Sequence, residues 1–204
     1  MITANEVRIS TRSELLHNFS FDFRDGNIYL ITAENGSGKT TLLRTMVGLI
    51  HVKKGTFLID GAKFKDKKLQ TFYWESSDWF NDQLTGADYL KFVYKQWHSK
   101  QNVAKVIQFW GMGDYVNLPI KKYSLGMKQR LIIALYETSD AKNLLMDEIS
   151  NGLDSDGREL LYSRLRILAD NGKCIIITSH YRDEIADYID CQLAFDSGTL
   201  VEVK

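Results

Sequence analysis

A glycine-rich loop at residues 33–40, AENGSGKT, carries the side chains of this chain that are best suited to bind phosphate. It matches the pattern G-x-x-x-x-G-K-[ST] at every position but the first, where Ala33 replaces glycine. The two glycines let the backbone curl closely around an anion. Lys39 would reach the β- and γ-phosphates of a nucleotide, and the Thr40 hydroxyl would ligate Mg²⁺.

The segments on either side of this loop predict the elements that must position it. Asn27–Ile31 is typical of a short buried strand, and Thr41–Val47 of the first turns of a helix. A strand, a loop rich in backbone N–H groups and a helix N-terminus together form an anion site. The effect of Ala33 depends on its backbone, because a β-carbon costs roughly 1–2 kcal/mol at positive φ and nothing at negative φ.

A second group of candidate residues ends the apolar run Leu144–Glu148. Ligands of open α/β sheets bind at the carboxyl ends of the strands, so Asp147 is expected beside the glycine-rich loop, where its carboxylate suits a Mg²⁺ shell. Glu148 is one residue further and points elsewhere, which suits a base for an attacking water. Two acids after a strand are often only a polar turn, but the loop upstream favours the chemical interpretation.

Composition limits the possible classes of protein. Among 204 residues, 44% are apolar, and 26 basic side chains balance 26 acidic ones, so no overall field favours nucleic acid or anionic lipid. No run approaches the ~20 apolar residues of a membrane-spanning helix. The first residues, MITANE, do not resemble a signal peptide. Cys174 and Cys191 lack C-x-x-C spacing, and we expect two buried thiols in a cytosolic protein.

Strands that alternate with helices predict an α/β fold with a mostly parallel sheet flanked by helices. Alternating apolar residues near the N-terminus predict a small antiparallel part. Strand-like runs nearly vanish from residue 76 to residue 141, which indicates an inserted helical subdomain. Residues 1–75 and 142–204 would then form the core of a single domain.

Further expectations concern individual elements. A helix from about Ser155 to Asn171 is expected to bury one leucine stripe, and the charged run Lys63–Lys68 is expected to be a solvated turn. The stripe consists of Leu160, Leu161, Leu165 and Leu168. The expected strands are Glu6–Ser10, Asn18–Phe23, Gly55–Gly61, Asn143–Asp147, Cys174–Thr178, Gln192–Phe195 and Thr199–Val203.

The segment Tyr123–Arg130, YSLGMKQR, resembles the LSGGQ signature of ABC-type ATPases. Ser124 is placed to cap a helix that begins around Met127, and Gly126 allows close backbone approach to phosphate. Over the whole chain, the order of the motifs is similar to that of the nucleotide-binding subunit of an ABC transporter. The form of the signature is similar to that of subunits that serve bacterial peptide, antibiotic or lantibiotic export and immunity systems.

The resemblance implies a role for each matching position. It implies that ATP is bound by one copy and contacted by the signature of a second copy. The implied ATP-binding residues are Ala33, Glu34, Asn35, Gly36, Ser37, Gly38, Lys39, Thr40 and Thr41. The implied signature residues acting in trans are Ser124, Leu125, Gly126 and Met127, and Asp154 lies in the D-loop. The implied catalytic residues are Glu148 and the switch histidine His180, and the implied metal-shell residues are Thr40, Asp147 and Glu75.

Besides Ala33, three places in the sequence depart from the family pattern. Glu75 stands where the family has glutamine, and its carboxylate would still offer an oxygen to Mg²⁺ or water while adding negative charge near a triphosphate. The region Ile9–Ser13 has no aromatic residue on which adenine could stack, a contact worth ~1 kcal/mol or more. Ile149 replaces the proline that usually follows the two acids.

The resemblance implies an ATP hydrolase with ATP and Mg²⁺ as cofactors, which powers a transporter through ATP-driven dimerisation. The implied partners are a separate transmembrane permease, which would dock at Phe80–Tyr94, and a second ATPase subunit, with no nucleic acid. The implied location is the inner face of the cell membrane. Two alternatives stay open: a soluble ABC-type ATPase acting on nucleic acid or ribosomes, which the neutral charge disfavours, and a nucleotide-gated binding module with weak hydrolysis.

Overall fold

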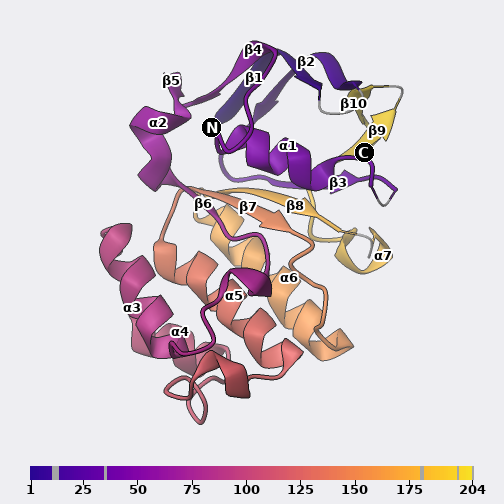
Figure 1. Ribbon diagram of the computed structural model, residues 1–204. Helices are drawn as coiled ribbons and strands as arrows, with labels where there is room; N and C mark the ends of the chain where they lie inside the picture. Colours follow the sequence, from indigo (N-terminus) through magenta and orange to yellow (C-terminus); the bar gives the residue numbers. More distant parts are fainter. Residues whose placement is uncertain (11–13, 35, 180–181, 197, 204) are drawn as a thin grey trace.

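The computed structural model describes residues 1–10, 14–34, 36–179, 182–196 and 198–203. Figure 1 shows how its strands and helices are arranged. The strands are β1 (Ile2–Ser10), β2 (Glu14–Phe23), β3 (Ile28–Thr32), β4 (Lys54–Ile59), β5 (Ala62–Lys63), β6 (Thr71–Tyr73), β7 (Asn143–Asp147), β8 (Cys174–Thr178), β9 (Cys191–Asp196) and β10 (Thr199–Glu202). The helices are α1 (Lys39–Met46), α2 (Phe64–Lys67), α3 (Gly86–Gln96), α4 (Val103–Phe109), α5 (Leu125–Ser139), α6 (Ser155–Asp170) and α7 (Arg182–Ile185).

A six-stranded sheet in the order β10-β9-β3-β8-β7-β6 forms the centre of the molecule. The strands from β9 to β6 pair in parallel, while β10 pairs antiparallel with β9. Strands β3, β7 and β8 are buried at nearly every position, because layers cover both faces of the sheet. Their sequences are therefore continuous apolar runs rather than alternating ones. The predicted α/β class with a mostly parallel sheet is confirmed.

The two faces of this sheet pack against different layers, because successive side chains of a strand point to opposite sides. On β8, Cys174 and Ile176 join a cluster with α1 and the N-terminal strands, whereas Ile175 and Ile177 join a cluster with α3, α4, α5 and α6. Figure 1 shows these helices below the central sheet and α1 above it. Helices from residues 76–141 thus share one apolar core with the sheet, and the expected subdomain boundaries stay a prediction.

A second, antiparallel sheet in the order β2-β1-β4-β5 covers α1 from the other side (Figure 1). Aromatic rings connect it to the central sheet. Tyr29 of β3 contacts Phe21 and Phe23 of β2 edge-on, with ring centroids 5.8 and 5.1 Å apart. Such edge-to-face pairs add to the energy of area burial. The predicted antiparallel part near the N-terminus is confirmed.

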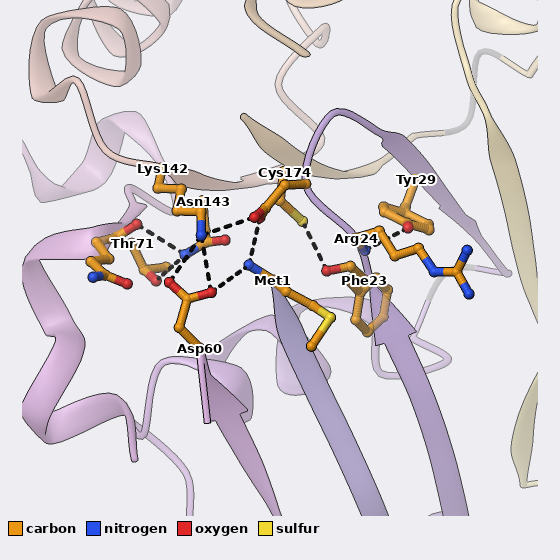
Figure 2. A network of polar contacts seen from close by, with 11 residues as sticks. Met1, Phe23, Arg24, Tyr29, Asp60, Thr71, Lys142, Asn143 and Cys174 are labelled. Carbon is orange, nitrogen blue, oxygen red and sulfur yellow. Dashed lines mark hydrogen bonds and ion pairs between the residues drawn. The ribbon is translucent and has the colours of Figure 1, made fainter. Parts of the chain in front are cut away.

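A polar corner joins the antiparallel sheet to the central one, as Figure 2 shows. The Met1 ammonium group donates to Asp25 at 2.5 Å and to Asp60 at 2.9 Å. Lys142, just before β7, contacts both carboxylates at 2.9 Å. Burial opposes ionisation of the two aspartates, but hydrogen bonds from Met1 and Lys142 outweigh it and lower the pKa of each. The start of β1 is therefore fixed to the end of the central sheet at which β7 begins.

Several local expectations need correction. The run Lys63–Lys68 is not a plain turn, since it includes the end of β5 and the one-turn helix α2. The signature helix begins at Leu125 rather than around Met127. Leu160 is 41% exposed, because it lies just outside the stripe that α6 buries. Cys174 and Cys191 are buried thiols, as predicted. In the described part of the chain, no helix is both long and apolar enough to cross a membrane.

The stripe of α6 yields a matched pair of variants. Leu161→Ala removes a fully buried side chain and should lower the free energy of unfolding by about 2–5 kcal/mol. Leu160→Ala makes the same chemical change on the exposed side and should cost less than ~1 kcal/mol. Urea unfolding followed by circular dichroism measures both, and equal losses would contradict the placement of this helix.

Candidate functional site

The glycine-rich loop connects β3 to α1 and presents the N-terminus of that helix. Gly36 and Gly38 have φ of 77° and 102°, and Gly38 is the N-cap of α1 without a side-chain cap. A β-carbon on Gly38 would lie 2.3 Å from the Leu15 side chain, so only glycine fits. Among the described residues, no side chain is recorded as capping the first N–H groups of the helix, which therefore suit an anion. Ala33 is not among the residues with positive φ, so its β-carbon causes no strain.

Lys39 is held inside this loop. Its Nζ donates to the carbonyl oxygens of Ala33 and Glu34 at 3.0 and 3.2 Å, and lies 3.9 Å from Oε1 of Glu148. The hydroxyl oxygen of Ser37 is buried, with no hydrogen-bond partner among the described residues. A buried lysine and an unpaired hydroxyl next to a helix N-terminus suit phosphate oxygens. The cavity there measures about 210 Å³ and is lined by Gly36, Gly38, Lys39, Thr40, Thr41 and Glu148.

Asp147, at the end of β7, is the centre of the polar contacts. Its two carboxylate oxygens accept hydrogen bonds from the hydroxyls of Thr40 and Thr178, each at 2.6 Å. Burial raises the pKa of Asp147, and the charges of Glu148 and Glu75 raise it further, against these two hydrogen bonds. A partly buried carboxylate that lacks a basic partner in these contacts suits a cation.

The donor set fits Mg²⁺ bound together with a nucleotide. A carboxylate and a hydroxyl are hard oxygen ligands, of the kind that Mg²⁺ prefers. Among the described residues, no three His, Cys, Asp or Glu side chains cluster as a metal site. The ion would therefore take Thr40 and Asp147 from the protein and complete its shell with phosphate oxygens and water.

Glu148 has an unusual backbone, with φ of 46°. A left-handed conformation costs roughly 1–2 kcal/mol at a residue with a β-carbon. Thr178 holds the backbone, since its carbonyl and hydroxyl oxygens accept from the Glu148 N–H at 3.1 and 2.9 Å. Asn151 Nδ2 donates to Oε2 at 2.7 Å. The strained turn separates Glu148 from Asp147 and directs its carboxylate toward the cavity at Lys39.

A larger cavity of about 370 Å³ adjoins the first, with which it shares Thr40 and Glu148. Glu75 lines it, but its oxygens are occupied. Arg44 Nε donates to Oε2 at 2.5 Å, a second Arg44 nitrogen contacts Oε1, and the Tyr73 hydroxyl donates to Oε2 at 2.8 Å. The hydrogen bonds from Arg44 lower the pKa of Glu75 most, and the one from Tyr73 lowers it further. Both oxygens of Glu75 are thus engaged by Arg44, and its place in a metal shell stays a prediction.

The signature segment begins α5. The Ser124 hydroxyl accepts from the Met127 N–H at 3.2 Å, which confirms the predicted cap. Leu125 is 64% exposed and lines the larger cavity together with Gly152. Asp154 caps α6 by accepting from the Gly157 N–H at 2.8 Å. Ser124, Gly126 and Met127 line neither of these two cavities. Ser124 is exposed, whereas Met127 packs against the core below the sheet.

A family model for the ABC transporter matches residues 16–151, which is more than half of the chain. The chain belongs to the ABC transporter family. This ABC protein is 29% identical to YhcH, an ABC transporter ATP-binding protein of Bacillus subtilis, over 93% of its own length and 65% of the relative's.

Two other relatives have more specific names. The lantibiotic transport ATP-binding protein SrtF of Streptococcus pyogenes is 29% identical over 86% of this ABC protein and 79% of SrtF. The bacitracin transport ATP-binding protein BcrA of Enterococcus faecalis is 31% identical over 98% of this ABC protein and 67% of BcrA. A solved ATP binding subunit of an ABC transporter has the same fold, with a TM-score of 0.89 at 18% identity, covering 99% of this chain and 89% of that one. The predicted family and fold are confirmed.

The structure brings most of the predicted site residues of the ABC protein together. Two adjoining cavities are lined by Gly36, Gly38, Lys39, Thr40, Thr41, Asp147 and Glu148, and the larger one also by Glu75 and Leu125. His180, Asn35 and residues 11–13 of the region expected to meet adenine lie outside the described residues. The individual roles of the site residues stay predictions.

Sequence analysis missed several residues of the site. Thr178 ends an isoleucine run on β8 just as Asp147 ends β7, so the argument from strand ends would have found it. Gln129 Nε2 donates to the carbonyl of Ile149, the residue that replaces proline after the two acids, and so holds that loop. Arg44 and Tyr73 gave no signal, because only the fold brings them to Glu75.

The raised pKa of Asp147 predicts a stability that depends on pH. Ionised Asp147 opposes folding above pH 3.8, its ordinary pKa. At pH 7 the Asp147→Asn variant should therefore unfold at a higher temperature than the parent, and the difference should shrink as the pH falls toward 3.8. Calorimetry across this range measures it, with the exposed Asp114→Asn as control. A less stable variant at pH 7 would contradict the assignment.

Proposed function

We propose that this ABC protein binds and hydrolyses ATP with Mg²⁺ and thereby powers the transport of a substrate by a separate membrane-spanning chain. The observation that carries the proposal is the arrangement of Lys39, Thr40, Asp147 and Glu148 around two joined cavities at the N-terminus of α1. This arrangement suits phosphoryl transfer to water, which needs positioning and charge stabilisation more than covalent chemistry.

Each residue has a defined task in this reaction. Lys39 exchanges its carbonyl contacts for phosphate oxygens, and the N–H groups of the loop bind the rest of the anion. Thr40 and Asp147 hold Mg²⁺, which neutralises charge on the phosphates when it is bound. Glu148 accepts a proton from the attacking water. His180, in the position of the family's switch histidine, would hold that water in line with the γ-phosphate.

A second copy or a related subunit completes the site. The signature loop and the D-loop lie together, with the Gly126 β-position 3.6 Å from the Gly152 carbonyl oxygen. Ser124 and Gly126 of one subunit would close on the γ-phosphate bound by its partner. Exposed Leu125 would become buried on closure. Binding of ATP thus drives dimerisation, and hydrolysis of ATP lets the dimer open.

An apolar groove supports docking of a membrane partner. It measures about 390 Å³ and runs between the end of α1, β6 and α3. Phe92 is 53% exposed there, and Lys68 is the one charged residue among the described lining residues. Its lining residues are Val47, Leu49, Phe64, Lys68, Leu69, Thr71, Tyr73, Trp79, Phe92, Gln96 and Trp97. We assign it to an amphipathic helix of the permease with an acidic residue facing Lys68, at the inner face of the membrane.

Relatives named for lantibiotic and bacitracin transport support a peptide antibiotic as cargo.

Two variants separate binding from hydrolysis. Glu148→Gln should retain ATP affinity, lose at least about 100-fold in turnover and accumulate an ATP-bound dimer. Lys39→Ala should lose ATP affinity. Phosphate release, titration with a fluorescent ATP analogue and size-exclusion chromatography measure these outcomes. Normal turnover of the first variant would exclude Glu148 as the base, and normal binding by the second would refute the nucleotide site.

The groove is tested by affinity purification from detergent-solubilised native membranes. The parent chain should recover a stoichiometric membrane-spanning protein, and Phe92→Glu should lose it. Ile167→Glu places the same charge on an exposed apolar position of α6 and should keep the partner. Equal recovery with both variants would exclude the groove, and no membrane-spanning partner with the parent chain would refute the transporter proposal.

A further inference from the structure

We propose that Arg44 is a positioning residue for Glu75. The ion pair between them cancels the negative charge of Glu75, so that this carboxylate can line a cavity that binds a polyanion. This inference rests on the proposed function, because it concerns the wall of the same nucleotide site. It assigns a role to Arg44, which no motif of the sequence indicates, and it explains how the chain functions with glutamate where the family has glutamine.

The contacts between the two side chains are specific. Both oxygens of Glu75 face the guanidinium group of Arg44, and the Tyr73 hydroxyl donates to Oε2 as a third contact. The Glu75 side chain is only 14% exposed, which limits screening by water. Bidentate pairs of this kind fix geometry as well as charge, and a lysine would not reproduce them.

The charges around the larger cavity explain why this pair matters. Glu75, Asp147 and Glu148 all line it, and none of its described lining residues is basic. Lys39 lies in the adjoining cavity, 3.9 Å from Glu148. An uncompensated Glu75 would therefore add a third carboxylate to a site for a triphosphate. At an effective dielectric constant of about 20, such a charge remains significant over several ångströms.

The position of Arg44 argues against a direct contact with the phosphates. It belongs to the last turn of α1, whereas the phosphate-binding N–H groups are at the first turn. Arg44 is five positions after Lys39 along the helix, a rise of roughly 7.5 Å. Arg44 therefore acts on the nucleotide through Glu75.

A charge-balanced set of variants tests this inference. The parent pair is neutral, Arg44→Gln leaves one negative charge, Glu75→Gln leaves one positive charge, and the double variant is neutral again. We expect Arg44→Gln to weaken the binding of a fluorescent ATP analogue about 10-fold at low ionic strength. We expect Glu75→Gln to bind as well as the parent or up to about threefold tighter, and the double variant to return to within about threefold of the parent.

The measurement is equilibrium titration of the purified chain with the analogue, with and without Mg²⁺, at two salt concentrations. The loss in Arg44→Gln should shrink at high salt, because screening weakens a charge effect and leaves a packing effect unchanged. Arg44→Lys should recover part of the affinity. Lys54→Gln removes a cation from an exposed ion pair with Glu6 and should bind like the parent.

Three results would overturn the inference: parental affinity in Arg44→Gln, a double variant as weak as Arg44→Gln, or weaker binding in Glu75→Gln, which would make Glu75 an essential ligand. If Arg44→Gln does not fold, the Glu75→Gln and double variants still decide. Lys39→Ala in the same assay keeps the two proposals apart. If it loses binding while Arg44→Gln does not, only the inference fails. If it binds normally, the nucleotide site itself fails.

Discussion

The carboxylate of Asp147 is the interaction on which the arrangement of the site depends. Two hydroxyls, from Thr40 of α1 and Thr178 of β8, donate to a carboxylate that ends β7. Three elements far apart in the sequence are thereby joined at one edge of the sheet. The same Thr178 also accepts from the Glu148 backbone, so the carboxylate proposed to hold a cation and the one proposed to act as base share a support.

Charge is the second constraint, because acidic groups gather where an anion is to bind. Burial and neighbouring carboxylates raise the pKa of Asp147, whereas hydrogen bonds from Arg44 and Tyr73 lower that of Glu75. The site therefore contains carboxylates in opposite electrostatic situations. In the described part of the chain, Asp147 is paired with hydroxyls and suits a metal ion, whereas Glu75 is already paired with the cation of Arg44.

Sequence reasoning located the fold and most of the site because both depend on local patterns. Buried parallel strands need continuous apolar runs, and a phosphate loop needs glycines where φ is positive, as at Gly38. It could not foresee that Arg44 meets Glu75, since that contact depends on how α1 packs beside the loop after β6. It was wrong to place Leu160 inside the buried stripe, since the side of α6 that faces the core carries Leu161 and Tyr162 while Leu160 is exposed.

The left-handed backbone of Glu148 has an evolutionary consequence. Glycine and asparagine adopt this conformation more easily than glutamate does, so exchange of Glu148 for either would relieve strain. In a lineage that no longer needed the carboxylate, mutational drift would remove it, since relief of strain and loss of constraint act in the same direction. A lineage that kept the acid group would bear this backbone cost, whereas one that lost it would not.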